Sequence, residues 1–251
     1  MRVCGVIALI GSSQYNVFYA LVLFLLKCKY NLDMNNINKI CSCFLLSGLL
    51  FGCATQEDYS EVYKKKCQTF ENKIEQDKYC DIDFVGDSIT EKYDIKKYYP
   101  EFKVVNRGIS GDTTDMLLTR MEVSALLLEP KIISLLIGTN NLDTCMDNYE
   151  YILKGFYDNL PTTKVVVVSI LPRRGKELCQ KIKENNEVIH SLADKYQYTY
   201  IDLYSPFIKD GDYKVNESLF KDGLHPNKKG YELMTSVLGP VFTNYLNAYN
   251  N

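Results

Sequence analysis

The chain has 251 residues, with 29 Lys and Arg against 31 Asp and Glu, so its formal net charge is −2. This balance excludes the strong positive field of proteins that bind nucleic acid mainly through charge. Hydrophobic residues make up 46% and charged residues 24% of the chain, which is typical of a globular protein. The length fits one large domain plus a targeting segment.

The N-terminal region resembles an export signal followed by a lipid attachment site. Residues 34–52 combine a short polar start, an apolar stretch and a small residue before Cys53, which is the layout of a signal peptide. The tetrapeptide Leu50-Phe51-Gly52-Cys53 resembles a bacterial lipobox, in which the cysteine is lipidated. Several acyl chains on Cys53 would hold the protein stably on a membrane surface. We therefore expect an exported protein, lipid-anchored to the bacterial cell envelope.

Residues 1–33 fit this layout poorly, because a second apolar stretch at 17–26 precedes Met34. We interpret residues 1–33 as an upstream extension and Met34 as the true start. A membrane hairpin made of both apolar stretches is the alternative, although each stretch is short for a span. Residues 53–79 are predicted to be a spacer and a lead-in helix, followed by a folded domain over 80–249.

Apolar, β-rich runs alternate with amphipathic stretches beyond residue 80. Strands are expected at 82–85, 103–105, 132–137, 165–170 and 198–201, and helices at 115–128, 149–159, 177–196 and 228–248. This alternation predicts a parallel sheet covered on both faces. The run KVVVVSI has no polar alternation, as expected of a central strand. The predicted fold class is α/β, a three-layer α/β/α sandwich around a five-stranded parallel sheet.

The segment DFVGDSIT, residues 83–90, places a Gly-Asp-Ser turn directly after the first strand. Ligands of open α/β sheets bind at the carboxyl ends of the strands, so Ser88 is either a helix cap or a nucleophile. Asp87 is adjacent to Ser88, and its side chain should point elsewhere and make structural hydrogen bonds.

A nucleophilic serine needs a base, and the base needs an orienting carboxylate. The segment DGLHP supplies both, since Asp222 lies three residues before His225. In a turn, this spacing lets the carboxylate accept the Nδ1 proton and leaves Nε2 free for Ser88. The other histidine, His190, lies opposite the apolar stripe of its predicted helix. We expect His190 to be solvated.

Two loops after neighbouring strands offer donors for an oxyanion. In NRGISGDTT, Gly108 can present an unobstructed backbone N–H, and in GTNN, Asn140 carries a side-chain amide. Each could equally be an ordinary turn residue. Candidate groups at four strand or helix ends on one side of the sheet nevertheless favour a catalytic site.

The motifs GDSIT, NRGISGDTT, GTNN and DGLHP, in this order, resemble the SGNH (GDSL) hydrolases over roughly residues 80–240. The stretch from GDSIT to GTNN is similar to the branch of platelet-activating-factor acetylhydrolase catalytic subunits. The resemblance implies a flavodoxin-like sheet and a serine esterase without metal or organic cofactor. A common variant has GTND where this chain has Asn141, so no role of an acid carries over there.

The resemblance also implies roles for individual residues. Ser88 would be the nucleophile, His225 the base and Asp222 its orienter. The oxyanion donors would be the Ser88 N–H, the Gly108 N–H and the Asn140 side chain.

Other nucleotide and hydrolase motifs are missing from the sequence. The phosphate-binding G-x-x-x-x-G-K-[ST], the dinucleotide-binding G-x-G-x-x-G and the α/β-hydrolase G-x-S-x-G do not occur at the expected positions. Asp81 and Asp83 flank the first strand and only weakly suggest a metal pair. The leading hypothesis is an esterase that cleaves short acyl or acetyl groups from lipid or carbohydrate through an acyl-enzyme. The alternative is a surface-anchored carbohydrate- or lipid-binding protein with the same fold and little turnover.

Two further features leave alternatives open. If the protein is exported, Cys67, Cys80, Cys145 and Cys179 could form disulfides, and we favour a Cys145–Cys179 bond, with four buried or free thiols as an equal alternative. In LPRRGKE, one of Arg173, Arg174 and Lys176 could face an anionic substrate, or the segment could be a solvated surface loop.

Overall fold

In a computed structural model of the chain, the structure describes residues 59–211 and 213–249. The predicted segments 1–33 and 34–52 and the predicted lipidation site Cys53 lie outside these ranges. Residues from Tyr63 onward form one compact unit, and all elements below belong to it.

Five parallel strands form the central sheet in the order β2-β1-β3-β4-β5. The strands are β1 Ile82–Gly86, β2 Val104–Gly108, β3 Ile132–Leu136, β4 Lys164–Val168 and β5 Thr199–Ile201. The register places Gly86 beside both Gly108 and Leu136, so the first three strands end at the same level. The predicted five-stranded parallel sheet is confirmed.

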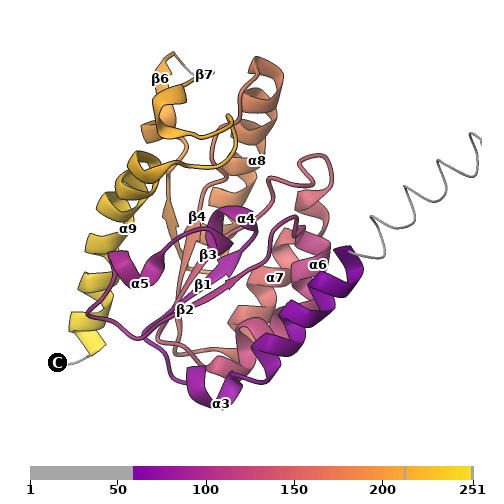
Figure 1. Cartoon of the computed structure of the whole chain (residues 1–251), viewed down its shortest axis with the longest axis vertical. Helices are drawn as coiled ribbons and strands as arrows, with labels where there is room; N and C mark the ends of the chain where they lie inside the picture. The colour runs from indigo at the N-terminus through magenta and orange to yellow at the C-terminus, as the bar shows by residue number, and fades with distance from the viewer. Residues whose placement is uncertain (1–58, 212, 250–251) are drawn as a thin grey trace, which may run out of the picture. The chain divides into compact units, whose positions relative to one another are not determined.

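Helices cover both faces of this sheet. They are α3 Ile74–Asp77, α4 Ser88–Glu91, α5 Ile95–Tyr98, α6 Thr114–Ser124, α7 Cys145–Asn159, α8 Lys176–Lys195 and α9 Lys228–Tyr249, and residues 63–71 are also helical. Helices α5 and α9 lie on one side of the sheet, and α6 and α7 lie on the other (Figure 1). Helix α7 also packs against α8. The predicted three-layer α/β/α sandwich is confirmed.

Apolar side chains fill the space between the sheet and both helical layers. The valines of β4, residues 165–168, are at most 2% exposed, because the strand is central and has helices on each face. On the α9 face, Phe84 of β1 packs against Tyr99 and Phe242 with ring centroids 5.4 and 5.6 Å away. Burial of such aromatic side chains is a large stabilising term.

Local details differ from the predicted elements. The helix expected over 115–128 ends at Ser124, because Ala125 leaves the helical conformation at φ −148°, and Leu126–Leu128 form a separate 3₁₀ turn. A small antiparallel ribbon of β6 Ile208–Asp210 and β7 Lys214–Val215 was not predicted. Strands this short carry no readable alternation.

The favoured Cys145–Cys179 disulfide is wrong, because the four cysteines of the described residues are free thiols. Cys145 and Cys179 are fully buried, at the first turns of two different helices. The Cys179 Sγ donates a hydrogen bond to the Arg173 carbonyl at 2.9 Å. Burial raises the pKa of Cys145 to about 11, which keeps this thiol protonated at neutral pH.

Within the described ranges, the search for a helix long and apolar enough to cross a membrane finds none.

Candidate active site

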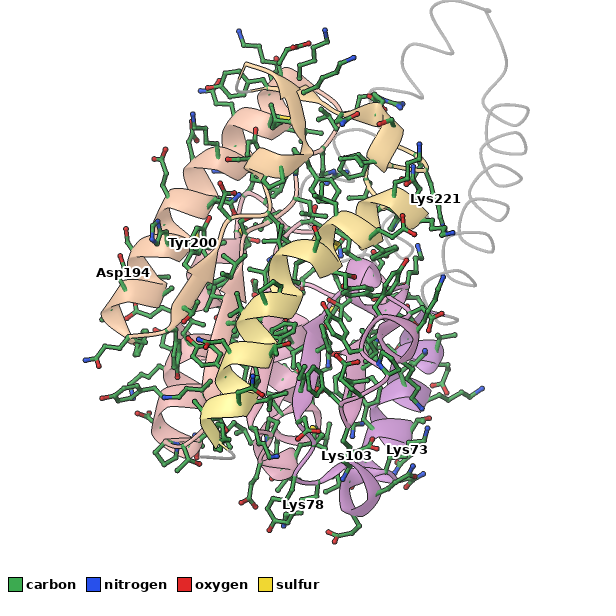
Figure 2. All side chains as sticks on the ribbon, turned by 90° about the vertical axis from the view of Figure 1, so that its left-hand side faces the viewer. Lys73, Lys78, Lys103, Asp194, Tyr200 and Lys221 are labelled. Atoms are coloured by element: carbon green, nitrogen blue, oxygen red, sulfur yellow. The ribbon has the colours of Figure 1, made fainter. Side chains whose placement is uncertain are left out.

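The candidate residues gather at the carboxyl ends of the strands. In Figure 2, Lys221, next to Asp222, lies in the upper part of the molecule, far above Lys78 and Lys103 near its lower end, and Lys103 directly precedes β2. The loops after β1, β2 and β3 therefore meet the DGLHP segment at the sheet edge where ligands of open α/β folds bind.

Ser88 is the first residue of α4 and is only 5% exposed. The strand before it ends at Gly86, where a Cβ would lie 2.2 Å from the Leu136 carbonyl oxygen, so only glycine permits this close approach. Asp87 then caps α4, since its Oδ1 accepts the Ile89 N–H at 2.9 Å. Contacts within the turn and with β3 therefore fix the Ser88 backbone independently of its contact with His225.

The Asp87 side chain has the structural role that the sequence predicts. Its second oxygen, Oδ2, is buried without a hydrogen-bond partner in the described residues. Burial raises the pKa of Asp87 to about 7, because desolvation disfavours the charged carboxylate. Asp87 therefore supports the turn through the Ile89 N–H and makes no hydrogen bond to Ser88 or His225.

Ser88, His225 and Asp222 form a continuous chain of polar contacts. The Ser88 Oγ lies 3.0 Å from His225 Nε2, and His225 Nδ1 lies 2.7 Å from Asp222 Oδ2. Both distances are within hydrogen-bond range. The structure thus brings Ser88 to His225, 137 positions away in the sequence, and to Asp222 beyond it. The contacts follow the order that a serine nucleophile, a base and an orienting carboxylate require.

The Asp222 turn is held by its own backbone. Asp222 Oδ1 accepts the N–H groups of Leu224 and His225 at 3.0 and 2.8 Å, and the Lys221 N–H donates to the His225 carbonyl at 2.8 Å. Hydrogen bonds from the His225 backbone and side chain lower the pKa of Asp222 below its usual range. Asp222 therefore stays ionised and can accept a hydrogen bond from the His225 Nδ1–H group.

The prediction that Gly108 donates to an oxyanion does not fit the structure. The Gly108 N–H donates instead to the Asn106 side-chain Oδ1 at 2.9 Å. A Cβ at Gly108 would lie 2.2 Å from the Glu91 backbone nitrogen, so the glycine permits close packing of β2 against α4. The Asn106 amide reinforces this contact by donating to the Thr90 carbonyl at 2.8 Å.

A second glycine in the same loop, Gly111, is the better candidate donor. It is exposed at φ 80°, and among the described residues its amide has no hydrogen-bond partner. The next residue, Asp112, offers its carbonyl to Asn140 Nδ2 at 2.8 Å, which places Gly111 beside Asn140. The signal in the sequence is a Ser-Gly-Asp turn just before Thr113, the side-chain cap of α6.

The turn after β3 supplies Asn140 and a neighbour with a different task. Asn140 is exposed, and one hydrogen of its amide is engaged by the Asp112 carbonyl, so the second remains for an oxyanion. Asn141 instead donates to the Thr114 hydroxyl at 3.0 Å. Asn141 therefore ties this turn to the start of α6, a task that does not need an acid.

A buried arginine braces the strand end behind Ser88. Arg120 is 3% exposed, and its Nη2 donates to the Gly86 carbonyl at 3.0 Å. Its Nε donates to Asp112 Oδ2 at 2.8 Å, and its Nη1 donates to the Ser124 hydroxyl at 2.6 Å. One cation thus links the end of β1, the Gly111 loop and α6, a role that the sequence reading missed.

The weakly suggested metal pair is not formed. Asp81 accepts the Lys103 N–H and pairs with Lys131 Nζ, each at 2.8 Å, while Asp83 is fully buried, and burial raises its pKa well above the usual range. In the part of the chain that is described, no group of three or more His, Cys, Asp or Glu residues could hold a metal ion.

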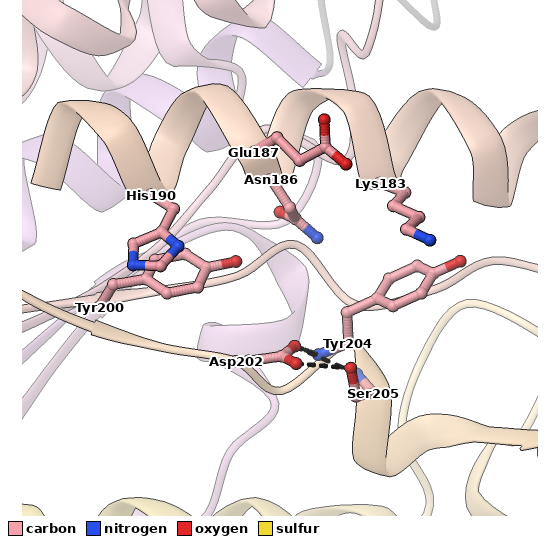
Figure 3. A pocket seen from close by; sticks show the side chains of 8 residues that line it. All are labelled: Lys183, Asn186, Glu187, His190, Tyr200, Asp202, Tyr204 and Ser205. Carbon is pink, nitrogen blue, oxygen red and sulfur yellow. Dashed lines mark hydrogen bonds between the residues drawn. The ribbon is translucent and has the colours of Figure 1, made fainter. Parts of the chain in front are cut away.

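A separate hollow of about 390 Å³ lies between α8 and the residues after β5 (Figure 3). The His190 ring stacks on Tyr200 there, with centroids 4.3 Å apart, so the predicted solvated histidine lines a surface hollow. Asp202 in its floor already accepts the Tyr204 N–H and Ser205 hydroxyl, at 2.8 and 2.5 Å. None of the triad candidates lines this hollow.

Known proteins resemble this chain in both sequence and fold. The model of the GDSL-like lipase/acylhydrolase family matches residues 84–233. An acetylxylan esterase of Geobacillus stearothermophilus is 23% identical over 159 residues, which cover 56% of this chain and 73% of that protein. The family model spans the whole stretch from Ser88 to His225.

Solved structures share the fold at low sequence identity. A Streptococcus pneumonia protein whose name refers to platelet activating factor is 24% identical, with a TM-score of 0.70, over 77% of this chain and 98% of its own. A GDSL-like lipase of Bacteroides thetaiotaomicron is also 24% identical, with a TM-score of 0.62, over 72% and 97%. These two structures share the fold of this chain, that is, the central sheet and the helices that cover it.

Proposed function

The chain belongs to the GDSL-like lipase/acylhydrolase family, and as a carboxylic ester hydrolase it needs a nucleophile, for which we propose Ser88. The observation that carries this proposal is the 3.0 Å separation of Ser88 Oγ from His225 Nε2. At that distance the imidazole can take the hydroxyl proton as the oxygen attacks an ester carbonyl.

The proposed reaction proceeds in two halves. In the first, Ser88 Oγ bonds to the acyl carbon, His225 accepts the proton, and the tetrahedral intermediate collapses as His225 returns this proton to the departing alcohol. In the second, His225 takes a proton from water as the water oxygen attacks the acyl carbon, and the bond from this carbon to Ser88 Oγ then breaks as His225 returns the proton to Oγ and the carboxylic acid is released. Asp222 accepts a hydrogen bond from the Nδ1–H group throughout and stabilises the imidazolium.

The oxyanion would be held by the Asn140 side chain and by the backbone amides of Ser88 and Gly111. Asn140 has a hydrogen left to donate, and Gly111 beside it is an exposed residue whose amide has no hydrogen-bond partner among the described residues. Ser88 stands at the first position of α4, where helical N–H groups have no intrahelical partner. Preorganised donors of this kind stabilise charge that develops only in the transition state.

For the substrate, we propose short acyl groups, above all acetyl, on carbohydrate. The support is the sequence similarity to an acetylxylan esterase. An anionic lipid is less well supported, because Arg174, one of the candidate cations, is paired with Glu217 at 2.5 Å. Turnover of p-nitrophenyl esters should fall as the acyl chain lengthens, and acetylated xylo-oligosaccharides should be hydrolysed faster than lysophospholipids.

A fluorophosphonate probe tests the nucleophile directly. Folded protein should be labelled on Ser88, and the Ser88→Ala variant should be neither labelled nor active. A wild-type protein that binds acetylated oligosaccharide but neither reacts with the probe nor releases acetate would support the alternative, a surface-anchored binding protein. Labelling of another serine would reject Ser88 and keep the esterase.

We further propose that Cys53 is lipidated and anchors the enzyme to the bacterial envelope. The support is the lipobox-like sequence that ends at this cysteine. In a lipoprotein-processing bacterium, the wild-type protein should partition to membranes, and Cys53→Ser should release it and remove the lipid mass. Unchanged partitioning and mass would reject the anchor.

A further inference from the structure

The loop after β4 connects the two halves of the proposed catalytic site. It carries Arg173 and Arg174, which the reaction steps above do not use. Arg173 Nη1 donates to the Thr139 carbonyl at 3.0 Å, directly before Asn140. The Arg174 backbone N–H donates to the Gly223 carbonyl at 3.1 Å, in the turn between Asp222 and His225.

The Arg174 side chain reinforces the second of these contacts. Its Nε and Nη2 donate to the two carboxylate oxygens of Glu217 at 2.7 and 2.5 Å, a bidentate geometry that fixes the guanidinium plane. Gly223 has φ 82°, and a Cβ there would lie 3.0 Å from Arg174 Cβ and 3.3 Å from Cζ. The glycine therefore lets the catalytic turn lie directly against the arginine.

The loop after β4 is itself held in place by hydrogen bonds and burial. The Asn186 side chain accepts the Ile170 N–H at 2.8 Å and donates to the Ile170 carbonyl at 3.0 Å. Ile170 and Leu171 are at most 1% exposed, and the Cys179 thiol bonds the Arg173 carbonyl. The two arginines thus extend from a loop whose backbone is buried and held by hydrogen bonds.

The Asp222 turn, in contrast, has little burial of its own. The Asp222 side chain is 54% exposed, and that of His225 is 18% exposed. Local hydrogen bonds set the shape of the turn, but they do not fix its distance from Ser88. The contacts from Arg174 join the turn to the β4 loop and so can set that distance.

We infer that Arg174 is a positioning residue, which acts with Glu217 to hold the Asp222–His225 turn so that Nε2 stays within reach of Ser88. Arg173 supports the Asn140 turn from the same loop. This inference rests on the proposed function, since it assigns Ser88 and His225 their catalytic roles. Neither arginine needs to touch the substrate.

The inference predicts a loss of turnover without a loss of fold. The Arg174–Glu217 pair is 65% and 50% exposed, and exposed ion pairs contribute little to stability. A misplacement of a catalytic group by about 1 Å can cost up to about 10²-fold in rate. We therefore expect Arg174→Ala and Glu217→Ala each to lower kcat by about tenfold, with little change in KM.

The experiment compares these variants with a matched ion pair elsewhere. Lys195 and Glu150 are 2.5 Å apart and similarly exposed, at 58% and 43%, on α8 and α7. Lys195→Ala should leave kcat unchanged. Each variant is measured for kcat and KM on p-nitrophenyl acetate, for the rate of fluorophosphonate labelling of Ser88, and for its thermal midpoint.

Support requires that Arg174→Ala slow both turnover and labelling while its thermal midpoint stays within about 2 °C of wild type. The Arg174→Ala/Glu217→Ala double variant should be no slower than either single variant, because both remove one contact. Arg174→Lys, whose ammonium cannot form the bidentate fork, should be intermediate.

The inference is overturned if Arg174→Ala retains wild-type kcat, if the two single losses add, or if Lys195→Ala slows turnover equally. It is also overturned if turnover falls only in step with the thermal midpoint. Ser88→Ala in the same series separates the proposed function from the positioning role. Esterase activity in Ser88→Ala would reject the proposed role of Ser88. An inactive Ser88→Ala together with wild-type kcat in Arg174→Ala would reject only the positioning role.

Discussion

The Ser88 turn and the Asp222–His225 turn contribute to one site but are built differently. The Ser88 turn is buried, with Gly86 against β3 and Arg120 behind it. The Asp222 side chain is 54% exposed, and local hydrogen bonds hold its turn. Ser88, the proposed nucleophile, is thus fixed by the core, whereas His225, the proposed base, is fixed by polar contacts at the surface.

The pKa shifts of the two aspartates reflect this difference. Burial raises the pKa of Asp87 to about 7, while hydrogen bonds from His225 lower that of Asp222. The carboxylate that must stay charged is therefore the one in the exposed turn. An orienting acid as buried as Asp87 would be partly protonated at neutral pH.

The largest expected effect is the loss of kcat when a residue of the Ser88–His225 pair is replaced, because the two turns act as one catalytic unit. Ser88→Ala and His225→Ala should each lower kcat by at least about 10³-fold, and the double variant should be scarcely worse, because residues that act as a unit lose activity non-additively. Asp222→Ala should be milder, since the base remains. The measurement is kcat/KM on one aryl ester, with folding checked by circular dichroism.

His190→Ala is the matched control, since His190 lines the separate hollow beside α8. Its activity should be nearly that of wild type. Additive losses for Ser88 and His225, or a His190 variant as impaired as the His225 variant, would show that the base is assigned wrongly.

The next effect concerns a group that belongs to neither turn. Asn140→Ala should lower kcat by roughly 10²–10³-fold with little change in KM, because its donor matters chiefly when negative charge develops on the substrate. Asn141→Ala, which loses the contact with Thr114, should change kcat much less. Equal kcat values for wild type and Asn140→Ala would reduce Asn140 to a turn residue.

A smaller effect tests the packing role of Gly108. A Cβ there would approach the Glu91 backbone within 2.2 Å, so Gly108→Ala should lower the free energy of unfolding by about 1–3 kcal/mol. Gly239→Ala is the control, since its Cβ would meet only Tyr99 Cε1 at 3.8 Å within α9. Chemical denaturation measures both, and an unchanged stability of Gly108→Ala would refute the packing role.

The last prediction concerns the pH dependence of stability that follows from the raised pKa of Asp87, which distinguishes it from Asp222. With a folded pKa of about 7 and an unfolded value of about 3.9, Asp87 binds more protons in the folded state, so its contribution to stability falls as pH rises from about 4 to 7. Asp87→Asn removes this titration and can still accept the Ile89 N–H.

The stability of Asp87→Asn relative to wild type should therefore be higher at pH 8 than at pH 5, by about 2–3 kcal/mol. Urea unfolding at the two pH values measures the difference. A relative stability that is equal at both values, or higher at pH 5, would contradict a raised pKa of Asp87.

The sequence by itself was enough to predict the sheet and the candidate triad. Uninterrupted apolar runs such as KVVVV identify buried parallel strands, because a strand with helices on both faces has no solvent side. The Gly-Asp-Ser turn and the Asp-x-x-His spacing are local patterns, and residues three apart in a turn can contact each other. Each of these patterns involves only a few neighbouring residues and can therefore be recognised in the sequence.

Tertiary structure alone decided which glycine could donate to an oxyanion and that the four described cysteines stay free thiols. Both Gly108 and Gly111 suit a turn, but only the packed fold places Gly108 against the Glu91 backbone of α4, whereas Gly111 is an exposed residue of the loop. The Arg174–Glu217 contact joins residues 43 positions apart. Such long-range contacts depend on the relative placement of whole elements, which no local pattern encodes.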